Sequence, residues 1–270
     1  MPQREKQREK QEAEERSSPS GKIVYKAILK EGEEELERKS AALFWSGLAA
    51  GLSMGFSMVA EGLLTASLPD ERWRPLVAKF GYSAGFLIVI LGRQQLFTEN
   101  TLTPILPLLV RKPHATVANV LRLWSVVLVA NLVGAFLFAL VVGLTNVFDT
   151  DTRHAFAEMG TKAVEPGFAT VFLRGIFAGW LIALMVWLLP FAESARVWVI
   201  ILLTYLIGIG HLSHVIAGAT EVFTVAAMGQ LAWVTAIAGF ILPALIGNII
   251  GGVVLVAMLN HAQVVSGESA

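Results

Sequence analysis

Charge-free or nearly charge-free stretches alternate with short polar segments along most of this 270-residue chain. A bilayer core about 30 Å thick requires roughly 20 apolar residues per helix. Six stretches come close to that length when the second and fifth are continued across a polar interruption. They cover residues 41–60, 80–110, 123–148, 175–192, 197–228 and 231–260. The pattern predicts an all-α integral membrane protein with six transmembrane helices, of which the second and fifth are broken.

The composition agrees with a membrane protein and excludes other classes. Hydrophobic residues make up 55% of the chain and charged residues 16%, whereas a soluble domain carries roughly 25% charged residues. Twenty of the 42 charged residues fall within residues 1–40, so the rest of the chain has too few to cover the surface of a soluble enzyme. A net charge of zero without a basic stripe argues against nucleic-acid binding. The lack of cysteine excludes disulfides and thiolate metal sites.

The chain divides into three regions: a charged and amphipathic segment (residues 1–40), the six-helix domain (41–260) and a short tail (261–270). Apolar residues between positions 22 and 39 sit among Lys and Glu. This predicts either an amphipathic helix at the membrane interface or a solvated helix that leads into the first span. Lys and Arg are more numerous on the N-terminal side of the spans, which places both termini in the cytoplasm.

Short motifs recur in the same order in both halves of the domain. The matching pairs are Gly47/Gly51 with Gly175/Gly179, NLVG (131–134) with NIIG (248–251), and Thr98-Glu99 with Thr220-Glu221. Each half holds three predicted spans, so the second half enters the membrane from the opposite face. The sequence therefore predicts a 3+3 inverted repeat, in which solute sites lie near the midplane between discontinuous helices.

Small residues four apart allow helices to pack closely in lipid, and this explains the paired glycines. Asn131 and Asn248 occupy matching positions in the third and sixth spans. We expect both amides to be buried and to bond across helices or to the broken backbone. A direct contact with the solute is the alternative.

The two interruptions carry the candidate chemistry. They are LFTENTLTP, residues 96–104, and GIGHLSHVIAGATEV, residues 208–222. A broken helix at membrane depth must line a cavity or pack inside protein, and its free N–H groups favour anions. His214 can give a proton to a weak-acid anion near neutral pH; a packing role is its alternative. His211, His214 and Glu221 do not match a known metal-site spacing, so we predict no metal and no cofactor.

Four ionisable residues fall inside or near the spans: Arg93, Glu99, Glu221 and Glu61. Such residues are costly in a membrane and are functional candidates for that reason. The alternative is an ion-paired structural cluster in which Arg93 pairs with Glu99 or Glu221.

Several of these motifs together resemble the formate/nitrite transporter family. LPALIGNIIGG (242–252) resembles the signature of that family, LFTENTL (96–102) its broken second helix, and SHVIAG (213–218) its broken fifth helix with a central histidine. The run GRQQLFTENTLTPILPLL (92–109) is most similar to the YfdC-like inner-membrane branch. The resemblance covers about residues 40–260.

The resemblance implies an aquaporin-like fold, a homopentamer with one pore per protomer, and a place in the bacterial inner membrane. It also implies that small monovalent anions or their weak acids pass through the pore. By position, Leu96, Phe97 and Thr98 form one side of the constriction, His214 is the central proton donor, and Lys162 is the vestibule lysine. Two departures from the family pattern are Gly179, where an asparagine is common, and the added charges at residues 93, 99 and 221.

Taken together, we expect a channel or transporter and not an enzyme. Lys162 and half-helix amides attract an anion, Thr98 positions it, and His214 gives it a proton. The neutral acid then passes Phe97 and Leu96, because a neutral molecule loses far less solvation energy than an ion. The alternatives are a pore plugged by the charged residues, a neutral-solute channel of the aquaporin type, and an intramembrane metalloenzyme. The absence of paired NPA motifs argues against the second.

Overall fold

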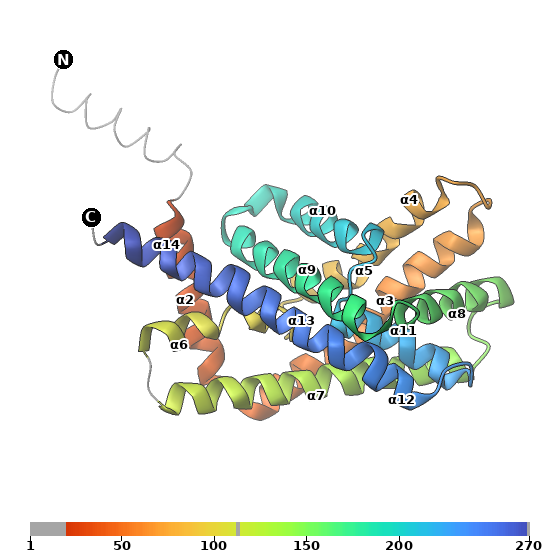
Figure 1. The fold of residues 1–270 in the computed structure, drawn as a ribbon, viewed down its shortest axis with the longest axis horizontal. Coiled ribbons are helices and arrows are strands. Elements are labelled where there is room, and N and C mark those ends of the chain that lie inside the picture. The colour runs from red at the N-terminus through yellow and green to blue at the C-terminus, as the bar shows by residue number, and fades with distance from the viewer. Residues whose placement is uncertain (1–19, 112–113, 269–270) are drawn as a thin grey trace, which may run out of the picture.

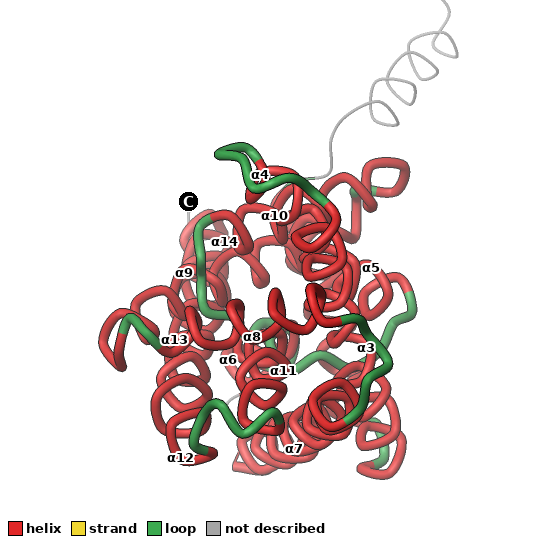
Figure 2. The backbone as a smooth tube through the Cα atoms, turned by 90° about the vertical axis from the view of Figure 1, so that its right-hand side faces the viewer, coloured by secondary structure: helices red, strands yellow, loops and turns green. Residues whose placement is uncertain are grey.

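A computed structural model describes residues 20–111 and 114–268 of the chain. Residues 1–19, about half of the predicted charged segment, lie outside the described residues, as does the end of the tail (269–270). The described residues form helices joined by short loops and contain no strand (Figures 1 and 2). This agrees with the predicted all-α class.

The helices follow the hydrophobic pattern. Their bounds are α2 Gly21–Glu37, α3 Ser40–Ser67, α4 Arg74–Ala78, α5 Ser83–Leu91, α6 Ile105–Arg111, α7 His114–Leu144, α8 Thr150–Val164, α9 Gly167–Leu188, α10 Arg196–Ile209, α11 Val215–Ala227, α12 Trp233–Thr235, α13 Leu242–Gly252 and α14 Leu259–Glu268. Two π-helical stretches, residues 236–241 and 253–258, join α12, α13 and α14 into one long helix.

Five helices within the described residues are long and apolar enough to cross a membrane. They are Ser40–Ser67, Arg74–Leu91, His114–Leu144, Gly167–Phe191 and Trp233–Ser266. The fifth predicted span is divided between α10 and α11, of 14 and 13 residues, and neither is long enough alone. In the second predicted span, α5 ends at Leu91 and α6 begins at Ile105, with a 3₁₀ turn between them.

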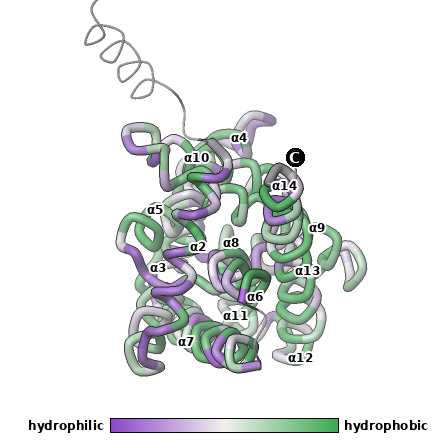
Figure 3. Tube along the Cα trace, turned by 90° about the vertical axis from the view of Figure 1, so that its left-hand side faces the viewer, coloured by the Kyte–Doolittle hydropathy of each residue, from purple (hydrophilic) through white to green (hydrophobic). Residues whose placement is uncertain are grey.

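Glycines set the closest helix contacts, as their spacing predicts. A Cβ atom at Gly51 of α3 would collide with the carbonyl of Asn131 in α7. A Cβ atom at Gly179 of α9 would collide with the carbonyl of Asn248 in α13. The same close packing therefore joins α3 to α7 and α9 to α13, and it brings each asparagine to the backbone that it bonds. Figure 3 shows that α9 and α13 are mainly hydrophobic.

Helix α2 is amphipathic, and its apolar face packs against protein. It packs against α6 and α14 with Tyr25, Ile28 and Leu36 buried (Figure 1). The Arg122 guanidinium fixes its end by donating to the carbonyl oxygens of Leu36 at 2.7 Å and Arg38 at 3.0 Å. Ile28 follows Tyr25 by three positions and Leu36 follows Ile28 by eight, so these buried residues share one face of the helix. This face is covered by protein rather than by solvent.

Candidate transport pathway

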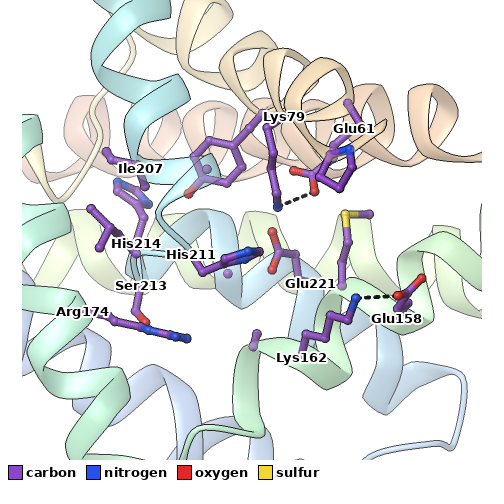
Figure 4. A pocket seen from close by; sticks show the side chains of 18 of the residues that line it. Glu61, Lys79, Glu158, Lys162, Arg174, Ile207, His211, Ser213, His214 and Glu221 are labelled. Atoms are coloured by element: carbon purple, nitrogen blue, oxygen red, sulfur yellow. Dashed lines mark hydrogen bonds and ion pairs between the residues drawn. The ribbon is translucent and has the colours of Figure 1, made fainter. Parts of the chain in front are cut away.

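Two cavities lie on either side of a buried partition. The first, of about 420 Å³, is lined by residues from α3, α8, α9 and α11, with His211 and His214 (Figure 4). The second, of about 750 Å³, is lined by residues of α2, by the chain around Gln95 and Glu99, and by Arg196. Leu96, Phe97 and Thr98 are 0–1% exposed and line neither cavity. We call these three residues the partition, because their neighbours Gln95 and Glu99 line the second cavity and Thr98 bonds the His214 that lines the first.

Asn131 of α7 holds the first junction, which we define as residues 92–104 between α5 and α6. Its Nδ2 donates to the carbonyl oxygens of Gly47 at 2.7 Å and Gln95 at 2.9 Å. Its Oδ1 accepts the N–H of Phe97 at 2.8 Å. One amide thus supplies two partners to backbone that has left the helical pattern, where unpaired groups are costly, and its third bond ties the junction to α3.

Asn248 of α13 holds the second junction, residues 210–214 between α10 and α11, in the same way. Its Nδ2 donates to the carbonyl oxygens of Gly175 and Ser213, both at 2.8 Å. Its Oδ1 accepts the N–H of Val215 at 2.9 Å. Both asparagines are 0% exposed and bond across helices to the backbone, as the sequence predicts.

His214 connects the two junctions. Its Nε2 lies 2.7 Å from Oγ1 of Thr98, and its Nδ1 accepts the backbone N–H of Ala217 at 3.2 Å as the N-cap of α11. Since Nδ1 acts as an acceptor, the proton of the neutral ring sits on Nε2 and is donated to Thr98. The Phe86 ring packs edge-on against the imidazole at 4.9 Å between centroids. The side chain is 1% exposed.

The four ionisable candidates do not form one cluster. Glu61 and Glu221 line the first cavity, whereas Arg93 and Glu99 line the second. The Arg93 side chain is 82% exposed and pairs with Glu31 of α2 at 3.6 Å, so the expected pairing with Glu99 or Glu221 is wrong. The chain turns at Arg93 with a φ of 51°, beyond the end of α5. His211 makes the matching turn beyond α10 with a φ of 50°.

Ion pairs occupy the first cavity. Lys79 binds Glu61 at 2.5 Å, and Lys162 binds Glu158 at 2.5 Å on α8 (Figure 4). Lys162 therefore lies at the cavity, where the vestibule lysine was expected, but with a carboxylate already on its ammonium group. Among residues 20–111 and 114–268, no group of three His, Cys, Asp or Glu side chains is placed to hold a metal ion.

Sequence reasoning missed the polar contacts beneath α2. Glu35 accepts hydrogen bonds from Thr103 at 2.5 Å and Gln95 at 3.1 Å, which joins α2 to the first junction. Glu35 sits one position before the apolar Leu36 in a run of glutamates, so nothing distinguishes it from its neighbours. Sequence reasoning also missed the ion pair between Lys79 and Glu61. Because a buried carboxylate needs a cation, the glutamate at position 61 within an apolar span could have indicated a nearby lysine or arginine.

Comparison with known proteins agrees with this geometry. A family model described as formate/nitrite transporter matches residues 22–262. The inner membrane protein YfdC of Escherichia coli (strain K12) is 41% identical over 241 residues, which are 89% of this chain and 78% of that protein. A probable formate transporter of Methanothermobacter thermautotrophicus is 24% identical and covers 90% of this chain and 88% of its own length.

Solved structures share the fold. An FNT family ion channel superposes with a TM-score of 0.76 at 19% identity, over 90% of this chain and 99% of that one. A pentameric formate channel with formate bound superposes with a TM-score of 0.69 at 21% identity, over 84% and 98% of the two chains. These proteins are transporters and channels, not enzymes.

Proposed function

Because the chain belongs to the formate/nitrite transporter family, we propose that it carries a small monovalent anion across the membrane together with a proton. The solute crosses the partition as the neutral weak acid. An ion that leaves water for a buried apolar passage loses much more solvation energy than the neutral acid does. Leu96 and Phe97 offer the solute only apolar side chains, so protonation lowers the barrier at this point.

The hydrogen bond between Thr98 and His214 carries the proposal. It is 2.7 Å long and buried, and it joins His214, which lines the first cavity, to Thr98, whose neighbour Glu99 lines the second. An anion that reaches Thr98 replaces the hydroxyl as the acceptor of the Nε2–H group. His214 then relays a proton to the anion, and Lys162 at the first cavity contributes attraction at longer range.

The architecture we propose is a 3+3 inverted repeat with broken second and fifth helices. The matching contacts of Asn131 and Asn248 support it, because they pair Gln95 with Ser213 and Phe97 with Val215, each 118 positions apart. Thr98-Glu99 and Thr220-Glu221 are 122 positions apart, so these two pairs do not occupy matching positions in the repeat. By analogy with the pentameric formate channel, the chain forms a pentamer, with both termini on the cytoplasmic side of the inner membrane.

Uptake by proteoliposomes tests the proposal. Formate, nitrite, acetate, lactate, chloride and glycerol are supplied outside at an acidic and at a neutral pH. We expect weak-acid anions to enter faster at acidic pH, and chloride and glycerol to remain outside. Entry of glycerol alone would identify a neutral-solute channel, and no entry of any solute would identify a plugged pore.

Substitution of His214 tests its part in transport. His214→Asn keeps an oxygen that can cap α11 but removes the ring, so we expect the pH dependence of uptake to flatten. Thr224→Val is the matched control, because Thr224 bonds only the carbonyl of Thr220 in its own helix. Uptake with an unchanged pH profile in His214→Asn would reject the proton relay.

A further inference from the structure

Each cavity contains a carboxyl group near the partition that the mechanism above does not use and that has no partner within the described residues. Glu221 of α11 lines the first cavity, and Glu99 lines the second. Within the described residues, neither side chain has a hydrogen bond or an ion pair. Their carboxyl oxygens are not fully buried, so these unpartnered oxygens are open to the cavities. Glu61 is the contrast, since its Oε1 is paired with Lys79 and its Oε2 is sealed.

The charged groups that surround Glu221 are already paired or lie at the rim. On the α3 and α4 side, Glu61 binds Lys79, and Arg74 binds Asp70 at 2.8 Å. Tyr82 faces the same space. None of these groups neutralises Glu221 by direct contact.

The opposite wall of the first cavity is similar. On α8, Lys162 binds Glu158, and Glu165 is exposed at the helix end. Arg174 of α9 and His211 of the second junction complete the wall. In Figure 4 the Glu221 carboxylate points into the space between Lys79, His211 and Lys162 without a bond to any of them.

The second cavity repeats the arrangement around Glu99. The other carboxylates of this cavity have partners: Glu34 with Lys30, Glu31 with Arg93, and Glu35 with Thr103 and Gln95. Arg38 and Arg196 are the remaining cations, and Arg196 donates to the carbonyl of Leu189 at 3.4 Å. Glu99 is thus the carboxyl group that no partner holds.

His214 cannot be the source of the proton that a neutral acid carries away. Its Nδ1 accepts the Ala217 N–H, so the neutral ring holds one proton, on Nε2. A ring that lost this proton outright would become an imidazolate, which is far too basic to persist. The proton must therefore enter the pathway at another group. Glu221 follows His214 by seven residues on the same face of α11, roughly 10 Å further along the helix.

We propose that Glu221 and Glu99 are the proton-exchange groups of this pathway, one on each side of the partition. The inference rests on the proposed weak-acid transport. In the first cavity the O–H bond of the Glu221 carboxyl breaks, its electron pair stays on Glu221 as carboxylate, and an O–H bond forms on the anion, directly or through His214. In the second cavity the acid returns this proton to the Glu99 carboxylate. Water then reprotonates Glu221 and takes the proton from Glu99, and the reverse direction uses the same steps.

Carboxyl groups suit this exchange for two reasons. No existing bond has to break before Glu221 or Glu99 gives or takes a proton. Transfer from a carboxyl group to another carboxylate also costs less free energy than transfer to the anion of a strong acid, because a carboxylate holds a proton far more tightly. The exchange therefore favours small monocarboxylates over the anions of strong acids.

Formate uptake by proteoliposomes that contain Glu221→Gln or Glu99→Gln tests the proposal. Glutamine has the same shape and removes only the exchangeable proton, so we expect uptake to fall on the order of 100-fold, the size of effect typical of losing a general acid. We expect Glu221→Asp to recover part of the rate. Glu165→Gln and Glu34→Gln are the matched controls, because each carboxylate borders one of the same cavities but is exposed to solvent, and we expect them to transport as the wild type does.

The possible outcomes separate this inference from the proposed function. Unchanged uptake in both glutamine variants would overturn the inference and leave weak-acid transport intact. Faster anion uptake in either variant would also overturn it, because that result identifies the carboxylate as an electrostatic barrier. Absence of transport by the wild type would instead reject the proposed function. Size-exclusion profiles and melting temperatures of each variant confirm that the assembly is unchanged, and the two variants, in separate cavities, test the inference independently.

Discussion

At the first junction, Asn131 bonds Gly47, Gln95 and Phe97, and at the second junction Asn248 bonds Gly175, Ser213 and Val215. The two sets use the same atoms in the same order. Beyond this shared set the junctions differ. After Phe97 the chain forms a 3₁₀ turn before α6 begins at Ile105, whereas α11 begins at once, with His214 as its cap.

The surroundings of the junctions also differ. Helix α2 covers the first junction through Glu35, and Arg93 turns outward to Glu31. The second junction opens onto the first cavity, whose wall includes α8. Within the described residues no side chain of α8 bonds this junction, and His211 takes the position of Arg93. In the proposed mechanism the shared bonds are scaffold, and the unshared residues, Thr98 and His214 above all, determine the chemistry.

Removal of either asparagine amide has the largest expected effect. Asn131→Ala and Asn248→Ala each leave one N–H and one carbonyl of the junction backbone without a partner, and an unsatisfied buried group costs about 1–3 kcal/mol. We expect both variants to lose several kcal/mol and to show similar drops in melting temperature. Asn260→Ala, which removes one bond to Val256 within a helix, is the control. A large drop in only one of the two variants would refute their equivalence.

Removal of the Thr98 hydroxyl has the next largest effect. Thr98→Val keeps the shape of the side chain and removes the partner of His214 Nε2, so a buried donor is left without an acceptor. We expect formate uptake to fall on the order of tenfold, in line with the loss of about 1–2 kcal/mol for one hydrogen bond. Melting temperature is measured in parallel, with Thr224→Val as the control. Full uptake by Thr98→Val would show that the hydroxyl does not position the solute.

Acidification strengthens the contact of α2 with the first junction. Burial raises the pKa of Glu35 above its ordinary value of 4.5, although the hydrogen bonds from Thr103 and Gln95 lower it. A raised pKa means that the docked helix favours the protonated carboxyl. Docking is therefore strongest below pH 4.5 and weakens as the pH rises through the raised pKa. Hydrogen exchange of residues 21–37 across this range measures it. Glu35→Gln should remove the pH dependence, and a dependence that persists would assign it to another group.

Loss of the Lys162 charge has the smallest effect. Its side chain is 61% exposed and its ammonium group already pairs with Glu158, so it attracts an anion weakly. We expect Lys162→Gln to reduce uptake less than about tenfold and to act mainly at low ionic strength. Uptake at two salt concentrations measures this, and a loss as large as that of Thr98→Val would mean that Lys162 binds the solute directly.

Local features of the sequence predicted much of this structure. Apolar length gave the long helices, and the buried amides of Asn131 and Asn248 followed from their place in apolar spans. The constriction residues and His214 came from the family resemblance together with the polar interruptions. These features depend on residues close in sequence or on motifs that recur as a unit.

Features that depend on tertiary contact were not predicted. Arg93 could pair with any nearby carboxylate, and only the position of α2 selects Glu31. The match of Thr98-Glu99 with Thr220-Glu221 rested on two common residues, whereas the contacts of the asparagines set a different register. The burial of α2 depends on α6 and α14, which no local pattern in residues 22–39 reveals.

Simultaneous measurement of formate uptake and internal pH in proteoliposomes, with and without an imposed membrane voltage, tests the central claim most directly. If the solute crosses as the neutral acid, one proton enters with each formate, the interior acidifies in step with uptake, and the voltage has no effect on the rate. Uptake that follows the voltage without acidification would mean that the bare anion crosses the partition, and it would contradict the account.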